Sequence, residues 1–184
     1  MKNKNLFALV LAGVLLFSVF ATGCSGGSKA TPEDPVLVEK NSIDAYENIL
    51  SSFEVSGGNV KFPDNYGGAY LNEERRLVIL IVPSGSFQSA VSEFISSAKI
   101  KDADDIIFQE ARYSLQYLND LMDQLNGLFL SNYSNPESIW SEVPGFSLLE
   151  NMNHISIYIN DIDDSKIERF KTEVYDSEAI VFAS

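Results

Sequence analysis

Cysteine, tryptophan and histidine are almost absent from this sequence, which contains one residue of each type, Cys24, Trp140 and His154. A lone cysteine cannot form a disulfide within the chain, and an unpaired exposed thiol is a liability outside the cell. A catalytic role for His154 would require a nucleophile and an orienting carboxylate, and no motif supplies either. Because it follows Asn153 at the start of an apolar run, we interpret His154 as a turn residue.

Positive charge is also scarce, since 13 lysines and arginines stand against 26 acidic residues, for a formal net charge of −13. A domain this acidic repels phosphate backbones and anionic lipid headgroups. The composition therefore excludes nucleic acid as a partner.

Motifs that carry chemistry are missing as well: the sequence has no GxSxG elbow, HExxH helix or P-loop. The acidic run Asn160–Asp164 invites a calcium interpretation, but the EF-hand frame then needs glycine at Lys166 and glutamate at Thr172. Helix capping is the better explanation for these aspartates, and residues 102–105 are interpreted as a solvated turn. We predict no enzyme activity, no cofactor and no metal site.

The first residues have the features of a targeting segment. Lys2 and Lys4 precede the apolar run Leu6–Ala21, which has the length and flanks of a secretory signal and is short for a membrane-spanning helix. The segment Ala21-Thr22-Gly23-Cys24 resembles the lipobox of bacterial lipoproteins, although Ala21 stands where that family usually has leucine.

This resemblance implies that the chain is cut before Cys24 and that Cys24 carries acyl chains such as palmitate. It places the protein on the extracytoplasmic face of the cell membrane, held by its lipid. The alternative is an ordinary secreted protein with a free thiol. We expect residues 1–23 to be the signal, residues 24–35 a flexible tether, and residues 36–184 a single domain.

The central feature of the first half of the domain is Phe62–Val82, which we interpret as a β-hairpin. A helix capped by Asn41 or Ser42 comes first and ends at Gly57-Gly58. The glycines at 67 and 68 then open a hairpin whose second strand, Leu77–Val82, has no polar member and is predicted to be central and buried. A helix capped by Ser84 or Ser86 and a strand over 106–113 complete this half.

The second half repeats this order after a long helix beginning at Ser114. Residues 144–159 form the second hairpin, a helix capped by Asp163, Asp164 or Ser165 follows, and residues 179–182 form the closing strand. The equivalences are Gly68 with Gly145, Leu77 with Ile155, Phe94 with Phe170, and the pair Ile106 and Phe108 with Ile180 and Phe182.

We therefore predict an α+β fold of two tandem strand-strand-helix-strand units, over about 62–113 and 144–184. A long helix joins the units, and helices pack on mostly antiparallel sheets. The alternative is two unrelated hairpins in one α+β domain.

The loosest stretch of the chain is 131–145, which contains Trp140. A tryptophan in a loop is most often a lid over the core, and the alternative is a contact for a partner. At the other end, Ala183 and Ser184 follow the closing strand and are a second candidate contact for a partner.

Two segments carry a family resemblance. The hairpin from Phe62 to Leu80 and the close from Ile167 to Phe182 resemble uncharacterised secreted and lipoprotein domains of Gram-positive bacteria. The domain type is similar to the pro-regions of secreted trypsin-like proteases of the alpha-lytic and streptogrisin kind. In those proteases the pro-region chaperones the catalytic domain, and its C-terminal strand and tail pack against that domain. Because no protease follows Ser184, any such role is expected to act in trans.

The sequence leaves three hypotheses for the function. The first is a non-catalytic, membrane-anchored binding domain for an unidentified ligand, which the lipobox and the missing catalytic set favour. The second is a protease inhibitor or folding helper acting in trans on a secreted serine protease, which the resemblance favours. The third is an enzyme that uses scattered carboxylates. A shallow cleft without carboxylates of raised pKa would count against the third function.

Overall fold

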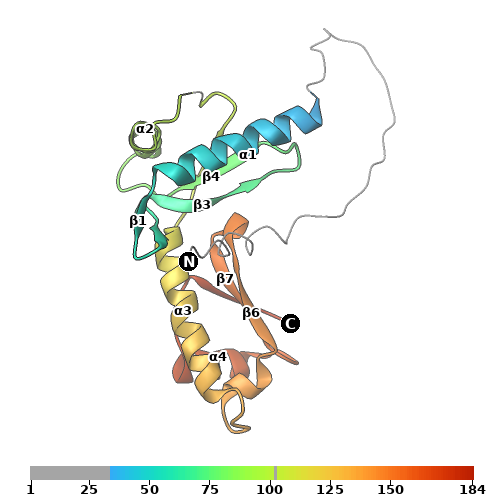
Figure 1. The fold of residues 1–184 in the computed structure, drawn as a ribbon. Helices are drawn as coiled ribbons and strands as arrows, with labels where there is room; N and C mark the ends of the chain where they lie inside the picture. Colours follow the sequence, from blue (N-terminus) through green and yellow to red (C-terminus); the bar gives the residue numbers. More distant parts are fainter. Residues whose placement is uncertain (1–33, 102) are drawn as a thin grey trace, which may run out of the picture. The chain divides into compact units, whose positions relative to one another are not determined.

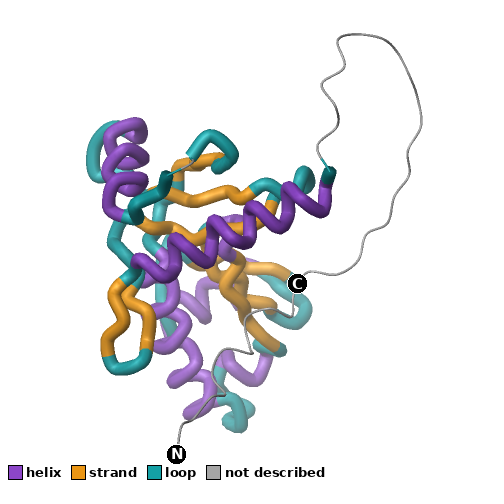
Figure 2. Tube along the Cα trace, turned by 45° about the horizontal axis from the view of Figure 1, so that its top comes forward, coloured by secondary structure: helices purple, strands orange, loops and turns teal. Residues whose placement is uncertain are grey.

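The computed structural model describes residues 34–101 and 103–184, which form an α+β fold, as predicted (Figures 1 and 2). Among these residues, no helix combines the length and the apolar character needed to cross a membrane. The elements in chain order are α1 Pro35–Ser52, β1 Glu54–Ser56, β2 Asn59–Lys61, β3 Tyr66–Leu71, β4 Leu77–Ile81, α2 Phe87–Ser97, β5 Ile107–Glu110, α3 Leu115–Asn132, the 3-10 turn η1 Ile139–Glu142, β6 Gly145–Leu149, the 3-10 turn η2 Glu150–Met152, β7 His154–Tyr158, α4 Asp164–Glu173 and β8 Ile180–Ala183.

The predicted central strand, β4, lies in the middle of the first three-stranded sheet, in the order β3-β4-β5. It pairs with β3 in antiparallel and with β5 in parallel orientation, because α2 carries the chain back to the same end of the sheet before β5 begins. All five residues of β4 are buried. Leu77, Ile79 and Ile81 face a core that also contains Ile49 of α1 and Phe94 of α2.

On the face of β4 that carries Val78, side chains of the two neighbouring strands meet each other. Tyr70 on β3 and Gln109 on β5 lie on either side of β4 on that face. The Tyr70 hydroxyl donates to Gln109 Oε1 at 3.0 Å, so the pair crosses the central strand above its apolar side chains. The tyrosine ring thus shields Val78 from solvent.

The second sheet has the same topology, in the order β6-β7-β8, with an antiparallel hairpin followed by a parallel pair and with α4 between β7 and β8. Ile155 and Ile157 of β7, and Ile159 directly after it, belong to a second core that contains Phe170 of α4. The prediction of two tandem strand-strand-helix-strand units joined by a long helix is therefore confirmed.

The predicted equivalences hold in the strand registers. Leu71 lies opposite Leu77 in the first hairpin, as Leu148 lies opposite Ile155 in the second. Phe108 lies beside Ile79, as Phe182 lies beside Ile157. The two units therefore share their strand register on both sides of the central strand.

The two cores meet along α3. Leu115 at the start of this helix belongs to the first core, whereas Leu118, Leu121 and Leu125 belong to the second. Leu148 of β6 packs against both cores. The long helix predicted to join the units therefore contributes side chains to both cores.

The start of the domain differs from the prediction. Asp34 caps α1 through a hydrogen bond from the Val36 N–H to its carboxylate, and Pro35 takes the first helical position. Asn41 and Ser42 lie inside the helix, where the buried Ser42 hydroxyl accepts from the Leu77 N–H at 3.1 Å. The proposed caps failed because an Asp-Pro pair upstream begins the helix a full two turns earlier.

The glycine pair at 57 and 58 does not end α1, which stops at Ser52. Both glycines have positive φ angles, 61° and 87°, and form the turn of an unpredicted hairpin between β1 and β2. Two successive positive φ angles fit the tight hairpin turns that match strand twist.

Other boundaries move by small amounts. β5 spans only Ile107–Glu110 of the predicted 106–113 segment, and the loose stretch contains η1 with Ile139 and Trp140 buried. The caps Ser86, Ser114 and Asp163 are as predicted. β8 extends to Ala183, one residue further than predicted, because the Ala183 carbonyl accepts from the Ile159 N–H at 2.9 Å.

The buried centre of β4 gives a stability prediction. Ile79→Asp should lower the free energy of unfolding by about 4 kcal/mol or more, because an unpaired carboxylate would replace a fully buried side chain. Urea denaturation followed by circular dichroism measures the change. Val55→Asp is the control, since Val55 is 64% exposed on β1 and should tolerate the charge. Equal midpoints for the two variants would contradict the assignment of the core.

Candidate functional site

The strand β8 forms an open edge of the second sheet, because β7 is its one neighbour among the described residues. The carbonyls of Ala179 and Ala183 accept from the N–H groups of Ile155 and Ile159 on β7, at 2.8 and 2.9 Å. Strand alternation then turns the backbone groups of Ile180 and Phe182 away from β7. Only the Ile180 N–H is occupied on that side, by the Ser177 carbonyl at 3.1 Å.

The side chains of β8 alternate in the same way. Ile180 and Phe182 face the second core, where the Phe182 ring meets Phe170 edge-on with 5.3 Å between ring centroids. On the outer face, Val181 is 44% exposed and lies beside Ser156, while Tyr158, 36% exposed, lies beside Ala183. The edge therefore offers free backbone groups together with an apolar outer surface.

The equivalent strand of the first unit, β5, is also an edge but a charged one. It ends in the exposed Glu110 and follows the acidic residues Asp104 and Asp105. Charged side chains on an edge strand discourage pairing with another strand. β8 itself, with the sequence Ile-Val-Phe-Ala, has no charged side chain, although the exposed Asp176 and Glu178 precede it.

The loop that leads into β8 is fastened to the segment between β5 and α3. Arg112 forms an ion pair with Glu178, and the Tyr117 and Ser177 hydroxyls lie 3.2 Å apart. The Ser177 hydroxyl also accepts from the Ala179 N–H at 3.1 Å. These contacts connect the loop before β8 to Arg112 and to Tyr117 of α3.

The structure locates most of the residues singled out from the sequence. Trp140 is only 3% exposed and its ring contacts the rings of Phe129, Phe146 and Phe170, so it fills the second core. This matches the interpretation of a lid and leaves almost none of the ring for a partner to contact. Ala183 is the half-buried last residue of β8, and Ser184 is exposed beyond it. Cys24 lies outside the described residues.

His154 meets a serine that the sequence interpretation did not pair with it. Its Nε2 lies 3.4 Å from the Ser156 hydroxyl and its Nδ1 lies 3.1 Å from the Met152 carbonyl, because residues 154 and 156 share one face of β7. Ser156, His154 and the Met152 carbonyl therefore stand in the order of a nucleophile, a general base and the acceptor that orients the base. However, Ser156 is only 5% exposed, so a substrate carbonyl could not approach its hydroxyl.

The acidic turn at 160–164 works as a helix start. Asp163 caps α4 by accepting from the Lys166 N–H at 2.8 Å. Within residues 34–101 and 103–184, no group of three or more histidine, cysteine, aspartate or glutamate side chains is arranged to hold a metal ion.

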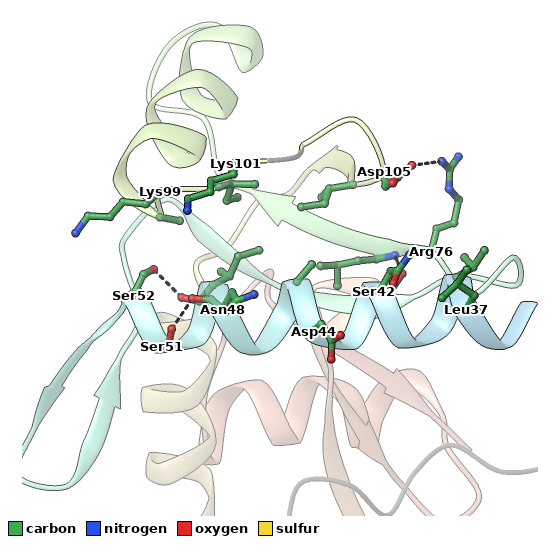
Figure 3. Close-up of a pocket in the computed structure, with 18 of the residues that line it drawn as sticks. Leu37, Ser42, Asp44, Asn48, Ser51, Ser52, Arg76, Lys99, Lys101 and Asp105 are labelled. Carbon is green, nitrogen blue, oxygen red and sulfur yellow. Dashed lines mark hydrogen bonds and ion pairs between the residues drawn. The ribbon is translucent and has the colours of Figure 1, made fainter.

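A groove of about 840 Å³ runs between α1 and the connection from α2 to β5 (Figure 3). Its lining includes three basic side chains, Arg76, Lys99 and Lys101, and three acidic ones, Asp34, Asp44 and Asp105. Arg76 is engaged by Asp105 at 3.2 Å. The mixed charge of this lining selects no single class of ligand.

The hairpin loop between β6 and β7 joins the two units through Asn153. Its side-chain oxygen accepts from the N–H groups of Arg112 and Tyr113 at 3.0 and 2.8 Å. Its side-chain nitrogen donates to the carbonyls of Gly67 and Tyr113 at 3.1 and 2.7 Å. The residue is buried and has a φ of 53°, in the left-handed region that asparagine tolerates better than most residues.

Glu150, in the same loop, packs against the first unit beside Tyr46 of α1 and Tyr66 of β3. Burial raises the pKa of Glu150, and the backbone N–H of Ala69 opposes this effect to a smaller extent. Burial and then the neighbouring Tyr46 and Glu150 raise the pKa of Tyr66 far above its ordinary value. The sequence interpretation missed both Glu150 and Asn153, and the one available signal was the tolerance of asparagine for turn conformations.

Together these observations define a class: an α+β domain made of two units of the same topology, with an open strand without charged side chains at its C-terminal edge. Comparison with protein families adds to this. Residues 31–111 match the model of the Pro-like N-terminal domain, and residues 116–184 match the model of the Pro-like C-terminal domain. The division falls between β5 and α3, at the segment that Asn153 binds.

No curated protein matches the chain. The family matches support the predicted similarity to protease pro-regions, because both halves of the domain are pro-region-like. Domains of this kind are typically non-catalytic.

The junction gives a second stability prediction. Asn153→Ala should lower the free energy of unfolding by about 2–4 kcal/mol, because four hydrogen bonds are lost and alanine disfavours the left-handed conformation. Chemical denaturation measures the loss. The matched control is Asn151→Ala, an exposed residue of the same loop, which should stay within about 0.5 kcal/mol of the wild type. Similar losses in both variants would rule out the proposed junction.

Proposed function

We propose that this protein is a non-catalytic, pro-region-like binding protein, anchored on the extracytoplasmic face of the membrane, whose partner is a secreted serine protease of the trypsin-like class. The observation that carries the proposal is the open, uncharged edge of β8 in a domain whose two halves both match Pro-like families. The protease contact involves β8 and the residues around its end, including Ala183 and Ser184.

An open edge strand binds a partner by adding one of the partner's strands to the sheet. The Phe182 N–H and the carbonyls of Ile180 and Phe182 supply the hydrogen bonds, while Val181 and Tyr158 supply apolar contact. The negative charge of the chain, −13 overall, favours encounter with a basic partner surface.

The choice of β8 over β5 rests on charge. Both are outer strands paired in parallel with a central strand, so the repeat presents two candidate edges. A partner strand beside β5 would have to desolvate Glu110, whereas β8 buries only apolar side chains and backbone groups. The second unit is therefore the better docking surface for an extended segment.

A substitution at the edge tests the protease contact. Val181→Lys should abolish or weaken binding at least tenfold, because a charge would be buried in the new strand pair while the fold remains intact. Titration calorimetry of the soluble domain against an inactivated trypsin-like protease secreted by the same organism measures the affinity. Val55→Lys, on the exposed strand β1, is the matched control and should bind like the wild type.

The same proteins separate the two pro-region-like activities. An inhibitor lowers the activity of the mature protease, whereas a folding helper raises the yield of active protease recovered from denaturant. Binding that is equal in the wild type and in Val181→Lys would place the contact elsewhere. The absence of heat with every secreted serine protease tested would overturn the proposed partner.

The anchor is tested separately. Cys24→Ala should remove labelled fatty acid from the product and release the protein from the membrane fraction, because Cys24 is the one thiol of the chain. Fractionation and mass spectrometry of the N-terminal peptide measure the two effects. Changing the neighbouring Ser25 to alanine is the control and should leave the lipid in place. A wild-type peptide without lipid would refute the anchor and leave the protease proposal untouched.

A further inference from the structure

The carboxyl group of Glu150 sits in a space that a glycine provides. Gly68 on β3 has a φ of 119°, and a Cβ built at this position would lie 3.3 Å from Glu150 Oε2 and 3.6 Å from Glu150 Cβ. A side chain at residue 68 would therefore press on the glutamate and would also strain the backbone. The second unit places its hairpin loop here because the first unit has no side chain in the way.

The groups that face this carboxyl come from each element packed against it. Tyr46 approaches from α1, Tyr66 and the Ala69 N–H from β3, and Glu150 itself belongs to η2. No cation is among them. The Tyr66 hydroxyl is buried, and its polar neighbour among these groups is the Tyr46 hydroxyl.

We propose that Glu150 is an acid-strengthened latch between the two units: the neutral carboxylic acid fits the junction formed by Gly68, Tyr46 and Tyr66, and the carboxylate loosens it. The reason is the cost of placing a negative charge in a partly buried site that contains two phenols, one N–H group and no cation. A neutral acid lacks that charge and can donate a hydrogen bond to a phenol oxygen.

The direction of the pH dependence follows from the pKa of Glu150, which burial raises. A group whose pKa is higher in the folded than in the unfolded protein binds its proton more tightly when folded. Its contribution to stability is complete below the unfolded pKa and is lost as the pH rises through the folded pKa. The latch therefore holds best in acid and weakens towards neutral pH.

Other acidic residues also affect stability as the pH changes, because mutual repulsion falls when carboxylates are protonated. The latch is therefore measured as a difference between proteins that share that background. Glu150→Gln keeps the shape and an acceptor for the Ala69 N–H but cannot ionise. The control is Glu110→Gln, which removes one exposed carboxylate from β5.

The experiment is urea denaturation of the three proteins from about pH 4 to about pH 8. The wild type and Glu150→Gln should have similar midpoints in acid, and Glu150→Gln should become the more stable as the pH rises. A difference of one between the folded and unfolded pKa of Glu150 corresponds to about a tenfold change in the unfolding equilibrium constant. Glu110→Gln should follow the wild type at every pH.

Two outcomes would overturn the latch. One is a constant difference between the wild type and Glu150→Gln at all pH values. The other is a carboxyl carbon resonance of Glu150 that titrates at or below the ordinary value of a glutamate, measured by NMR on the wild type. The NMR measurement decides the question even if Glu150→Gln fails to fold. Hydrogen exchange at the Ala69 amide gives a further test. Exchange is base-catalysed and slows in acid for every amide, so the latch is supported if the Ala69 amide slows by more than this general effect.

Discussion

The fold depends on one buried amide side chain. Each unit has a sheet three strands wide and a buried core of its own, and the two cores meet along α3. The units share α3, but a shared helix leaves the rotation of one sheet relative to the other open. Asn153 removes this freedom, because its four hydrogen bonds need Gly67, Arg112 and Tyr113 at fixed positions. Glu150 completes the same contact with a group that is costly to bury.

The repeat explains what the two units share, and the differences between them show how each is used. The central strands and the helices that follow them keep the same register and the same buried phenylalanines, Phe94 and Phe170. The first unit is covered by α1 and extended by the β1–β2 hairpin, whereas the second is closed by η1 with Trp140. The outer strands differ in charge: β5 ends in the exposed Glu110, whereas β8 has no charged side chain.

The sequence predicts local features well and long-range contacts poorly. The apolar run of β4, the caps Ser86 and Ser114 and the equivalence of the two units are each encoded within a few neighbouring residues. The hairpin of β1 and β2 was missed because its exposed strands have no apolar alternation. The binding of Asn153 to residues 40 and 86 positions away leaves no local pattern, and the same holds for the burial of Glu150.

The free-energy contributions of the contacts show which of them fixes β8 relative to the first unit. The Arg112–Glu178 ion pair and the Tyr117–Ser177 contact are exposed, and such contacts contribute about 0–1 kcal/mol each. The buried hydrogen bonds of Asn153 cost about 1–3 kcal/mol for each partner left unsatisfied. Asn153 directly precedes β7, the strand on which β8 is built. The placement of β8 relative to the first unit is therefore determined at the hairpin loop of β6 and β7, and the exposed pairs near Glu178 make the smaller contribution.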